Sequence, residues 1–167
     1  NNMISIFTKK KFVKYLKNYL NLFFYKLNIF FNFSKHNDTK IKYIVEKENW
    51  SIKWDGKYIS SQLNQKLNSN IISISELPDI NRKNKLFHFG SQYMWVDWYE
   101  LMPNDKKYVV SFFHGKKSDG PKVKEHIEDF LKSQNSIYKV ITASSLIHER
   151  LLNWGIPKLR DDITCMA

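Results

Sequence analysis

The sequence predicts an α/β protein built on a Rossmann-like, doubly wound parallel sheet. Short apolar runs alternate with amphipathic helical patterns from residue 40 to residue 155. The runs are almost continuously apolar, as in "VVSFF" at 109–113, and this is typical of parallel strands that helices cover on both faces. Hydrophobic residues make up 43% and aromatic residues 16% of the 167 residues, which is enough for a globular core.

The strands follow from these apolar, β-branched runs. They are predicted at residues 41–45, 71–75, 85–90, 108–114 and 138–144, and a sixth strand is expected close to Ala167.

The helices follow from apolar spacing and from end signals. Apolar residues four apart predict a helix from Gly56 to Leu67. Pro121 is placed as a first helical residue, with Asp119 and Gly120 as capping candidates. Ser144 or Ser145 can cap a last helix that Gly155 and Pro157 end. The inward residues of these helices are Ile59, Leu63 and Leu67; Val123, Ile127, Phe130 and Leu131; and Ile147, Leu151 and Trp154.

The net charge of +11 divides the chain into two parts. Residues 1–40 carry eight lysines and a single acid, Asp38, so most of the excess charge lies there. We therefore expect a basic, amphipathic helical extension over 1–39 and the Rossmann-like domain over 40–167. Lysines interrupt every apolar run of 12–33 well before the length of about 20 residues that a membrane span needs.

The extension is predicted to contact a membrane surface peripherally through residues 9–33. At about 100° per residue its apolar side chains share one face, and lysines and asparagines share the other. A basic amphipathic helix of this kind suits an anionic membrane surface, although a helix docked on the protein's own core or on a partner fits the pattern as well. The apolar face holds Phe12, Leu16, Tyr19, Leu20, Phe23, Leu27, Phe30 and Phe31, and the polar face Lys14, Lys17, Asn18, Asn21, Asn28 and Asn32.

A single cysteine, Cys165, excludes an intrachain disulfide and favours a reducing compartment. No signal peptide with a small-residue cleavage site is visible. We expect a cytoplasmic protein, peripheral at the inner face of the membrane.

Ligands of such sheets bind beyond the carboxyl ends of the strands. The segments predicted to lie there are the loop 46–56, the turn Gly90-Ser91-Gln92 and the loop that begins at His114. His88 lies inside a strand and is interpreted as a core histidine, and His126 and His148 as surface or packing residues on helices.

Four stretches carry a resemblance to a known family: "KYIVEKENWSIKWDGKYI" (42–59), "HFGSQ" (88–92), "VVSFFHGK" (109–116) and "VITASSLIHERLLNWGIPKLRDDI" (140–163). In order and spacing they resemble the N-terminal, acceptor-side domain of family 4 glycosyltransferases with the GT-B fold. The resemblance implies transfer of a hexosyl-type sugar from a nucleotide sugar to a glycan or lipid-linked acceptor, as in polysaccharide biosynthesis. It implies neither a cofactor nor a metal, and no Cys/His spacing typical of zinc is present.

The resemblance also implies roles for particular residues. His114 matches a histidine that reaches the transferred sugar, so it is the catalytic candidate. Asp55 either accepts a hydrogen bond from a sugar hydroxyl or caps the helix that follows it. The loop departs from the family's glycine-rich turn, because Gly56 is its one glycine. The substrate-binding candidates are Trp50, Trp54, Asp55, Gly56, Gly90, Ser91, Gly115 and Lys116.

The chain stops at Ala167, so we expect a fragment that lacks the C-terminal donor domain and is inactive alone. The alternative is a non-catalytic, membrane-associated sugar-binding module, or a subunit that needs a partner chain. Nucleic-acid binding is disfavoured because the charge lies on an amphipathic segment without a nucleic-acid motif. The absence of G-x-G-x-x-G after the first strand argues against a dehydrogenase half.

Overall fold

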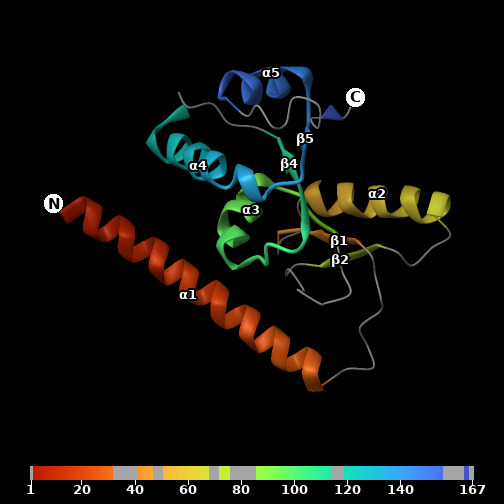
Figure 1. Ribbon diagram of the computed structural model, residues 1–167, viewed down its shortest axis with the longest axis horizontal. Coiled ribbons are helices and arrows are strands. Elements are labelled where there is room, and N and C mark those ends of the chain that lie inside the picture. Colours follow the sequence, from red (N-terminus) through yellow and green to blue (C-terminus); the bar gives the residue numbers. More distant parts are fainter. Residues whose placement is uncertain are drawn as a thin grey trace. The chain divides into compact units, whose positions relative to one another are not determined.

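The computed structural model describes residues 2–31, 41–46, 51–67, 72–75, 86–113, 119–155 and 164–165. The chain forms two compact units, residues 1–37 and residues 38–167. The described part of the first unit is one long helix, α1 (Asn2–Phe31). The second unit contains a parallel sheet with helices packed on it (Figure 1).

The sheet of the second unit has the order β2-β1-β3-β4-β5-β6, and every neighbouring pair is parallel. This confirms the predicted parallel α/β sheet. The order reverses at β1, because β2 lies on one side of it and β3 on the other. The strands are β1 (Ile41–Ile44), β2 (Ile72–Ser75), β3 (Leu86–Phe89), β4 (Lys107–Phe112), β5 (Lys139–Thr142) and β6 (Thr164–Cys165).

The reversal places helices on both faces of the sheet. Parallel crossovers are right-handed, so the β1–β2 connection and the connections from β3 to β6 put their helices on opposite faces. The contacts agree, since Tyr43 of β1 lies against one helix and Phe112 of β4 packs on Phe130 of another. The helices are α2 (Ser51–Leu67), α3 (Gln92–Trp98), α4 (Pro121–Lys132) and α5 (Ser145–Asn153), with short 3-10 turns at η2 (Tyr99–Leu101) and η4 (Gln134–Ser136).

The ends of α4 and α5 follow the predicted signals. Pro121 is the first residue of α4, where its missing N–H costs no helical hydrogen bond. Gly120 precedes it with φ 122° and gives no side-chain cap. Ser144 caps α5, because its Oγ accepts a hydrogen bond from the Ile147 N–H at 3.4 Å. Gly155 follows α5 with φ 80°, a left-handed conformation that glycine adopts without strain.

The prediction that residues 46–56 form a loop is wrong for residues 51–56. Helix α2 begins at Ser51, so Trp54, Asp55 and Gly56 are helical, and Asp55 does not cap the helix. Gly56 is needed inside α2 because the helix crosses Tyr43 closely: a Cβ at Gly56 would lie 2.6 Å from two atoms of the Tyr43 ring. The glycine therefore marks a close helix–strand contact rather than a helix start.

The sequence analysis also missed α3. Ser91 is its N-cap, with an Oγ that accepts from the Tyr93 N–H at 3.1 Å. The helix buries Met94, Trp95 and Trp98. These positions have the helical spacing i, i+1 and i+4, which was the signal that could have found this helix.

The core is rich in aromatic rings. Trp95 is fully buried and contacts Phe89 and Tyr108, each at a ring-centroid distance of 5.2 Å. On the other face of β3, His88 is buried, and its Nε2 lies 2.8 Å from the Ser111 Oγ. The Tyr43 ring packs edge-on against the imidazole. The interpretation of His88 as a core histidine is confirmed.

Candidate functional site

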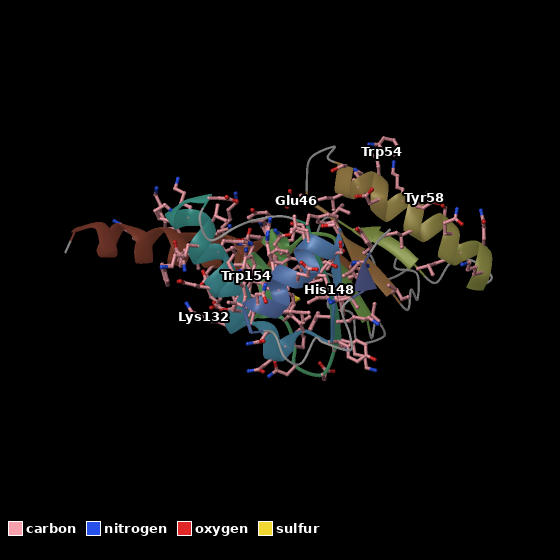
Figure 2. All side chains as sticks on the ribbon, turned by 90° about the horizontal axis from the view of Figure 1, so that it is seen from above. Glu46, Trp54, Tyr58, Lys132, His148 and Trp154 are labelled. Carbon is pink, nitrogen blue, oxygen red and sulfur yellow. The ribbon has the colours of Figure 1, made fainter. Side chains whose placement is uncertain are left out.

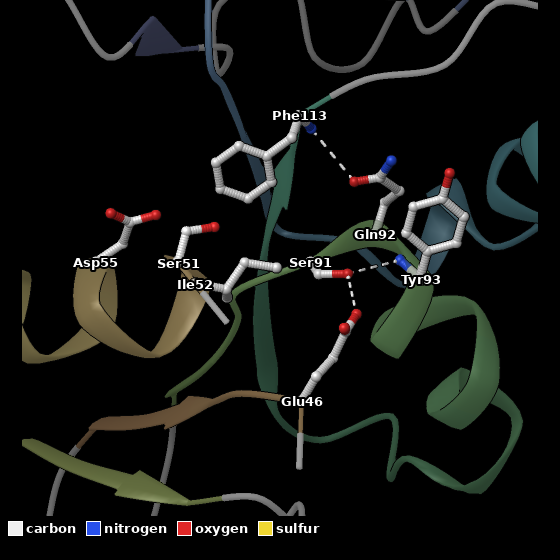
Figure 3. Close-up of a pocket in the computed structure, with 8 residues that line it drawn as sticks. All are labelled: Glu46, Ser51, Ile52, Asp55, Ser91, Gln92, Tyr93 and Phe113. Atoms are coloured by element: carbon white, nitrogen blue, oxygen red, sulfur yellow. Dashed lines mark hydrogen bonds between the residues drawn. The ribbon is translucent and has the colours of Figure 1, made fainter. Parts of the chain in front are cut away.

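A cavity of about 720 Å³ opens at the carboxyl ends of β1, β3 and β4. This is the point at which the strand order reverses, where ligands of doubly wound sheets bind. Side chains from four segments surround it: the end of β1, the first turns of α2 and α3, and the end of β4 (Figure 3). The lining residues are Glu46, Ser51, Ile52, Asp55, Ser91, Gln92, Tyr93 and Phe113. We call this cavity the switch-point pocket.

The α2 wall of the pocket carries available polar groups. Ser51 and Asp55 are separated by one helical turn and line the same pocket. Within the described residues, neither side chain forms a hydrogen bond or an ion pair, and Figure 3 shows no interaction drawn to either. Among the described residues, no partner therefore competes with a ligand for this hydroxyl and this carboxylate.

The opposite wall is fixed by hydrogen bonds. The buried Ser91 hydroxyl donates to Glu46 Oε1 at 2.9 Å. The Gln92 side-chain oxygen accepts from the Phe113 N–H at 3.2 Å, which joins the start of α3 to the end of β4. The Tyr93 ring stacks on His126 with a centroid distance of 4.1 Å. These contacts hold the wall in place before a ligand arrives.

The described lining of the pocket is acidic. Two of its lining residues are carboxylic acids, and among the described residues that line it none is Lys, Arg or His. Burial raises the pKa of the Tyr93 phenol, and the nearby charges of Glu46 and Asp119 raise it further. Burial, followed by the charge of Asp55, likewise raises the pKa of Tyr43. Such a field favours ligands that donate hydrogen bonds over ligands that bring negative charge.

The floor next to the α2 wall is tightly packed. A Cβ at Gly90 would lie 2.7 Å from Ile52 Cγ2 and 2.8 Å from Tyr43 Cε1. The buried Tyr43 hydroxyl has no hydrogen-bond partner among the described groups. Gly90 also donates its N–H to the Ile44 carbonyl at 2.9 Å, which ties the end of β3 to β1. The absence of a side chain at Gly90 thus brings α2 and α3 close enough to share one pocket.

The structure brings together two of the predicted substrate-binding side chains, Asp55 and Ser91, in the pocket. Gly90 and Gly56 are not among its lining residues; both lie against the Tyr43 ring, where they allow close packing. Trp54 is 62% exposed on α2 and does not line the pocket (Figure 2). Its ring lies under the Lys57 ammonium at 4.3 Å. The remaining candidates lie outside the described residues: Trp50, His114, Gly115 and Lys116.

Tyr93 and Phe113 are pocket residues that the sequence analysis did not single out. Phe113 belongs to an apolar strand run, so nothing local distinguishes it from a core residue. Its place directly before His114 was the available signal. Tyr93 follows the predicted turn Gly90-Ser91-Gln92 by a single residue.

Comparisons with known proteins give no family for this chain: no family model, no curated protein and no solved structure matches it.

Proposed function

We propose that the second unit is the sugar-binding, acceptor-side half of a GT-B glycosyltransferase and that the switch-point pocket holds a hydroxyl-rich ligand. The observation that carries this proposal is the pocket lining. Carboxylates and hydroxyls meet at the carboxyl edge of a parallel sheet, and no basic side chain is among the described lining residues.

A sugar ring matches this lining chemically. Asp55 and Glu46 can accept hydrogen bonds from sugar hydroxyls, and hydrogen bonds to a charged group contribute about 1.5–3 kcal/mol each. The Ser51 hydroxyl can both donate and accept. The Phe113 and Tyr93 rings offer apolar faces for the C–H surfaces of the sugar.

The same lining disfavours a phosphate group. A phosphate in the pocket would face two carboxylates without a basic partner among the described lining residues, and like charges at short range repel strongly when water is excluded. The diphosphate of a nucleotide-sugar donor would then need other groups, in the second domain that the family resemblance implies. The pocket therefore suits the acceptor or the transferred hexosyl unit.

Asp55 provides the first test of the sugar site. Asp55→Asn is expected to weaken the binding of a methyl hexoside about tenfold, because the amide keeps the size of the side chain but loses the charge that strengthens the hydrogen bond. Ligand-observed NMR titration of the 167-residue chain against a panel of methyl hexosides, UMP, FMN and NAD measures this change. Asp105→Asn, at an exposed turn residue outside the pocket, is the matched control and leaves binding unchanged.

The ligand panel also decides between classes of protein. Glycosides that bind while UMP, FMN and NAD do not would agree with a sugar pocket. If FMN or NAD binds and no glycoside does, and if Asp55→Asn leaves that binding unchanged or strengthens it, the domain binds a nucleotide cofactor. This result would contradict the proposal.

His114 separates a transferase half from a simple binding module. It directly follows the pocket residue Phe113 in the chain, and an imidazole can hydrogen-bond a hydroxyl of the transferred sugar in either protonation state near neutral pH. We expect His114→Ala to weaken hexoside binding about fivefold while the thermal unfolding midpoint stays within 2 °C, which corresponds to a change of at most about 0.5–1 kcal/mol in the free energy of unfolding. Unchanged binding would favour a non-catalytic sugar-binding module.

A further inference from the structure

Helix α1 exposes an apolar face that is wider than a globular core requires. Nine large hydrophobic side chains of this helix are between 37% and 65% exposed. At 100° per residue they occupy about half of the helix circumference, compared with roughly 100° for a helix that packs on a core. These residues, which we call the apolar half, are Phe12, Val13, Tyr15, Leu16, Tyr19, Leu20, Phe23, Phe24 and Leu27.

Between residues 10 and 21 the other half of α1 is basic and polar, and the buried Leu22 follows on the same side. Residues 2–31 contain six lysines and no acidic residue. Lys10, Lys14 and Lys17 lie opposite the apolar half, together with the asparagines 18 and 21. Lys9 falls within the sector of the apolar half, near one end of its run, where its alkyl stem can lie on the apolar surface while its ammonium reaches water.

The helix is long enough to cross a bilayer but has the wrong composition. Thirty residues make a helix of about 45 Å, which exceeds the hydrocarbon thickness of about 30 Å. Yet among the described helices none contains a stretch apolar enough to be a membrane span. A wide apolar half combined with a basic half instead favours a helix that lies in the plane of a membrane surface.

We propose that α1 binds flat on an anionic lipid surface, with its apolar half at the headgroup–acyl boundary and its lysines on the headgroups. Tyr15 and Tyr19 belong to a residue type that concentrates at this interface, because the ring is apolar and the hydroxyl stays hydrated. Phe23 and Phe24 pack edge to face with centroids 5.8 Å apart, and together they form the bulkiest part of the apolar half.

Charge complementarity favours an anionic lipid surface as the partner of α1 over a second copy of α1 and over a nucleic acid. Two copies of α1 packed through their apolar halves would bury Lys9 of each chain in the apolar seam, and residues 2–31 contain no acidic residue that could pair with it. A nucleic acid would neutralise the lysines but would leave the apolar half in water. An anionic membrane buries the apolar half and also neutralises the lysines of the other half.

Vesicle co-sedimentation of the full chain tests this proposal. We expect binding to vesicles of phosphatidylcholine with about a third phosphatidylglycerol, and binding at least tenfold weaker to phosphatidylcholine alone. K14Q/K17Q is expected to weaken binding to the anionic vesicles roughly 25-fold, since each lysine near an anionic surface strengthens binding about fivefold. The matched control, K122Q/K124Q, removes the same charge from exposed positions of α4 and leaves binding within twofold.

A second variant tests the apolar half. F23S/F24S keeps every charge and is expected to weaken binding at least tenfold, whereas purely electrostatic attraction predicts no change. Equal binding to neutral and anionic vesicles would overturn the proposal, and so would binding that K14Q/K17Q leaves unchanged. A chain that does not bind vesicles but forms a dimer, which F23S/F24S dissociates, would overturn it as well. Since these readouts involve α1, they are independent of the sugar titrations.

Discussion

Trp95→Ala is expected to lower the free energy of unfolding of the second unit by about 3–5 kcal/mol, the usual cost of deleting a fully buried tryptophan side chain. Trp95 has no exposed surface. Its ring packs against Phe89 and Tyr108, and its Nε1 donates to the Ser133 hydroxyl at 2.7 Å. The substitution therefore leaves a large cavity and a buried hydroxyl that loses this hydrogen bond.

Urea denaturation measures this loss, and the same substitution at an exposed tryptophan is the control. Trp54 is 62% exposed, so Trp54→Ala should change the free energy of unfolding by less than about 0.5 kcal/mol. A Trp95→Ala variant as stable as Trp54→Ala would contradict the packing of α3 on β3 and β4.

The Trp95→Ala substitution should also affect ligand binding in the switch-point pocket. Helix α3 carries Ser91 and Gln92 at its start, and these residues position Glu46 and the end of β4. Since Trp95 anchors this short helix to the sheet, folded Trp95→Ala protein should also bind hexosides more weakly than the wild type. Stability and ligand binding are thus linked through one buried ring.

The sheet could be predicted because several of its strands lie in almost continuously apolar runs, as at 109–113, a pattern that few other structures share. The ends of α4 and α5 could be predicted because proline, serine and glycine act locally on the backbone, whatever the rest of the chain does. Pro121, Ser144 and Gly155 are the residues that carried these predictions, and each occupies the expected position.

The place of Gly56 inside α2 depends on a contact between distant segments, whereas α3 carried a local signal in the spacing of Met94, Trp95 and Trp98. Gly56 is a poor helix former, so its place inside α2 reflects the nearby Tyr43 ring rather than local propensity. The pocket shows the same limit. Asp55 could be selected from its chemistry. At Phe113 the available signal was only its place before His114, and its position in the pocket follows from the end of β4 lying beside α2 and α3.

The acidic pocket also accounts for a departure noted in the sequence. The glycine-rich turn that the proposed relatives, family 4 glycosyltransferases, place close to donor phosphates is absent after β1; here Glu46, Ser51 and Asp55 line the pocket. Carboxylates at this position repel phosphate and attract hydroxyl groups. Under the proposed function, the departure in sequence and the chemistry of the described lining favour the same ligand class, a neutral sugar.

The second unit should lose stability as the pH falls from about 6.5 to about 4, and His88 should account for about 3 kcal/mol of that loss. Burial lowers the pKa of His88 from 6.5 to about 4, because its imidazole is only 8% exposed. Between these two pH values the unfolded chain binds a proton that the folded chain does not, so protons favour unfolding. One pKa unit corresponds to about 1.4 kcal/mol.

His88→Gln separates this contribution from those of the acidic residues. Glutamine does not titrate and can still hydrogen-bond Ser111, which the His88 Nε2 contacts at 2.8 Å. Urea denaturation at a series of pH values should show a flatter profile for the variant between pH 6.5 and 4, and hexoside binding at pH 7 should stay within twofold of the wild type. Parallel pH profiles of the wild type and His88→Gln would mean that His88 is hydrated in the folded state. A large loss of sugar binding in His88→Gln would mean that His88 takes part in the binding site.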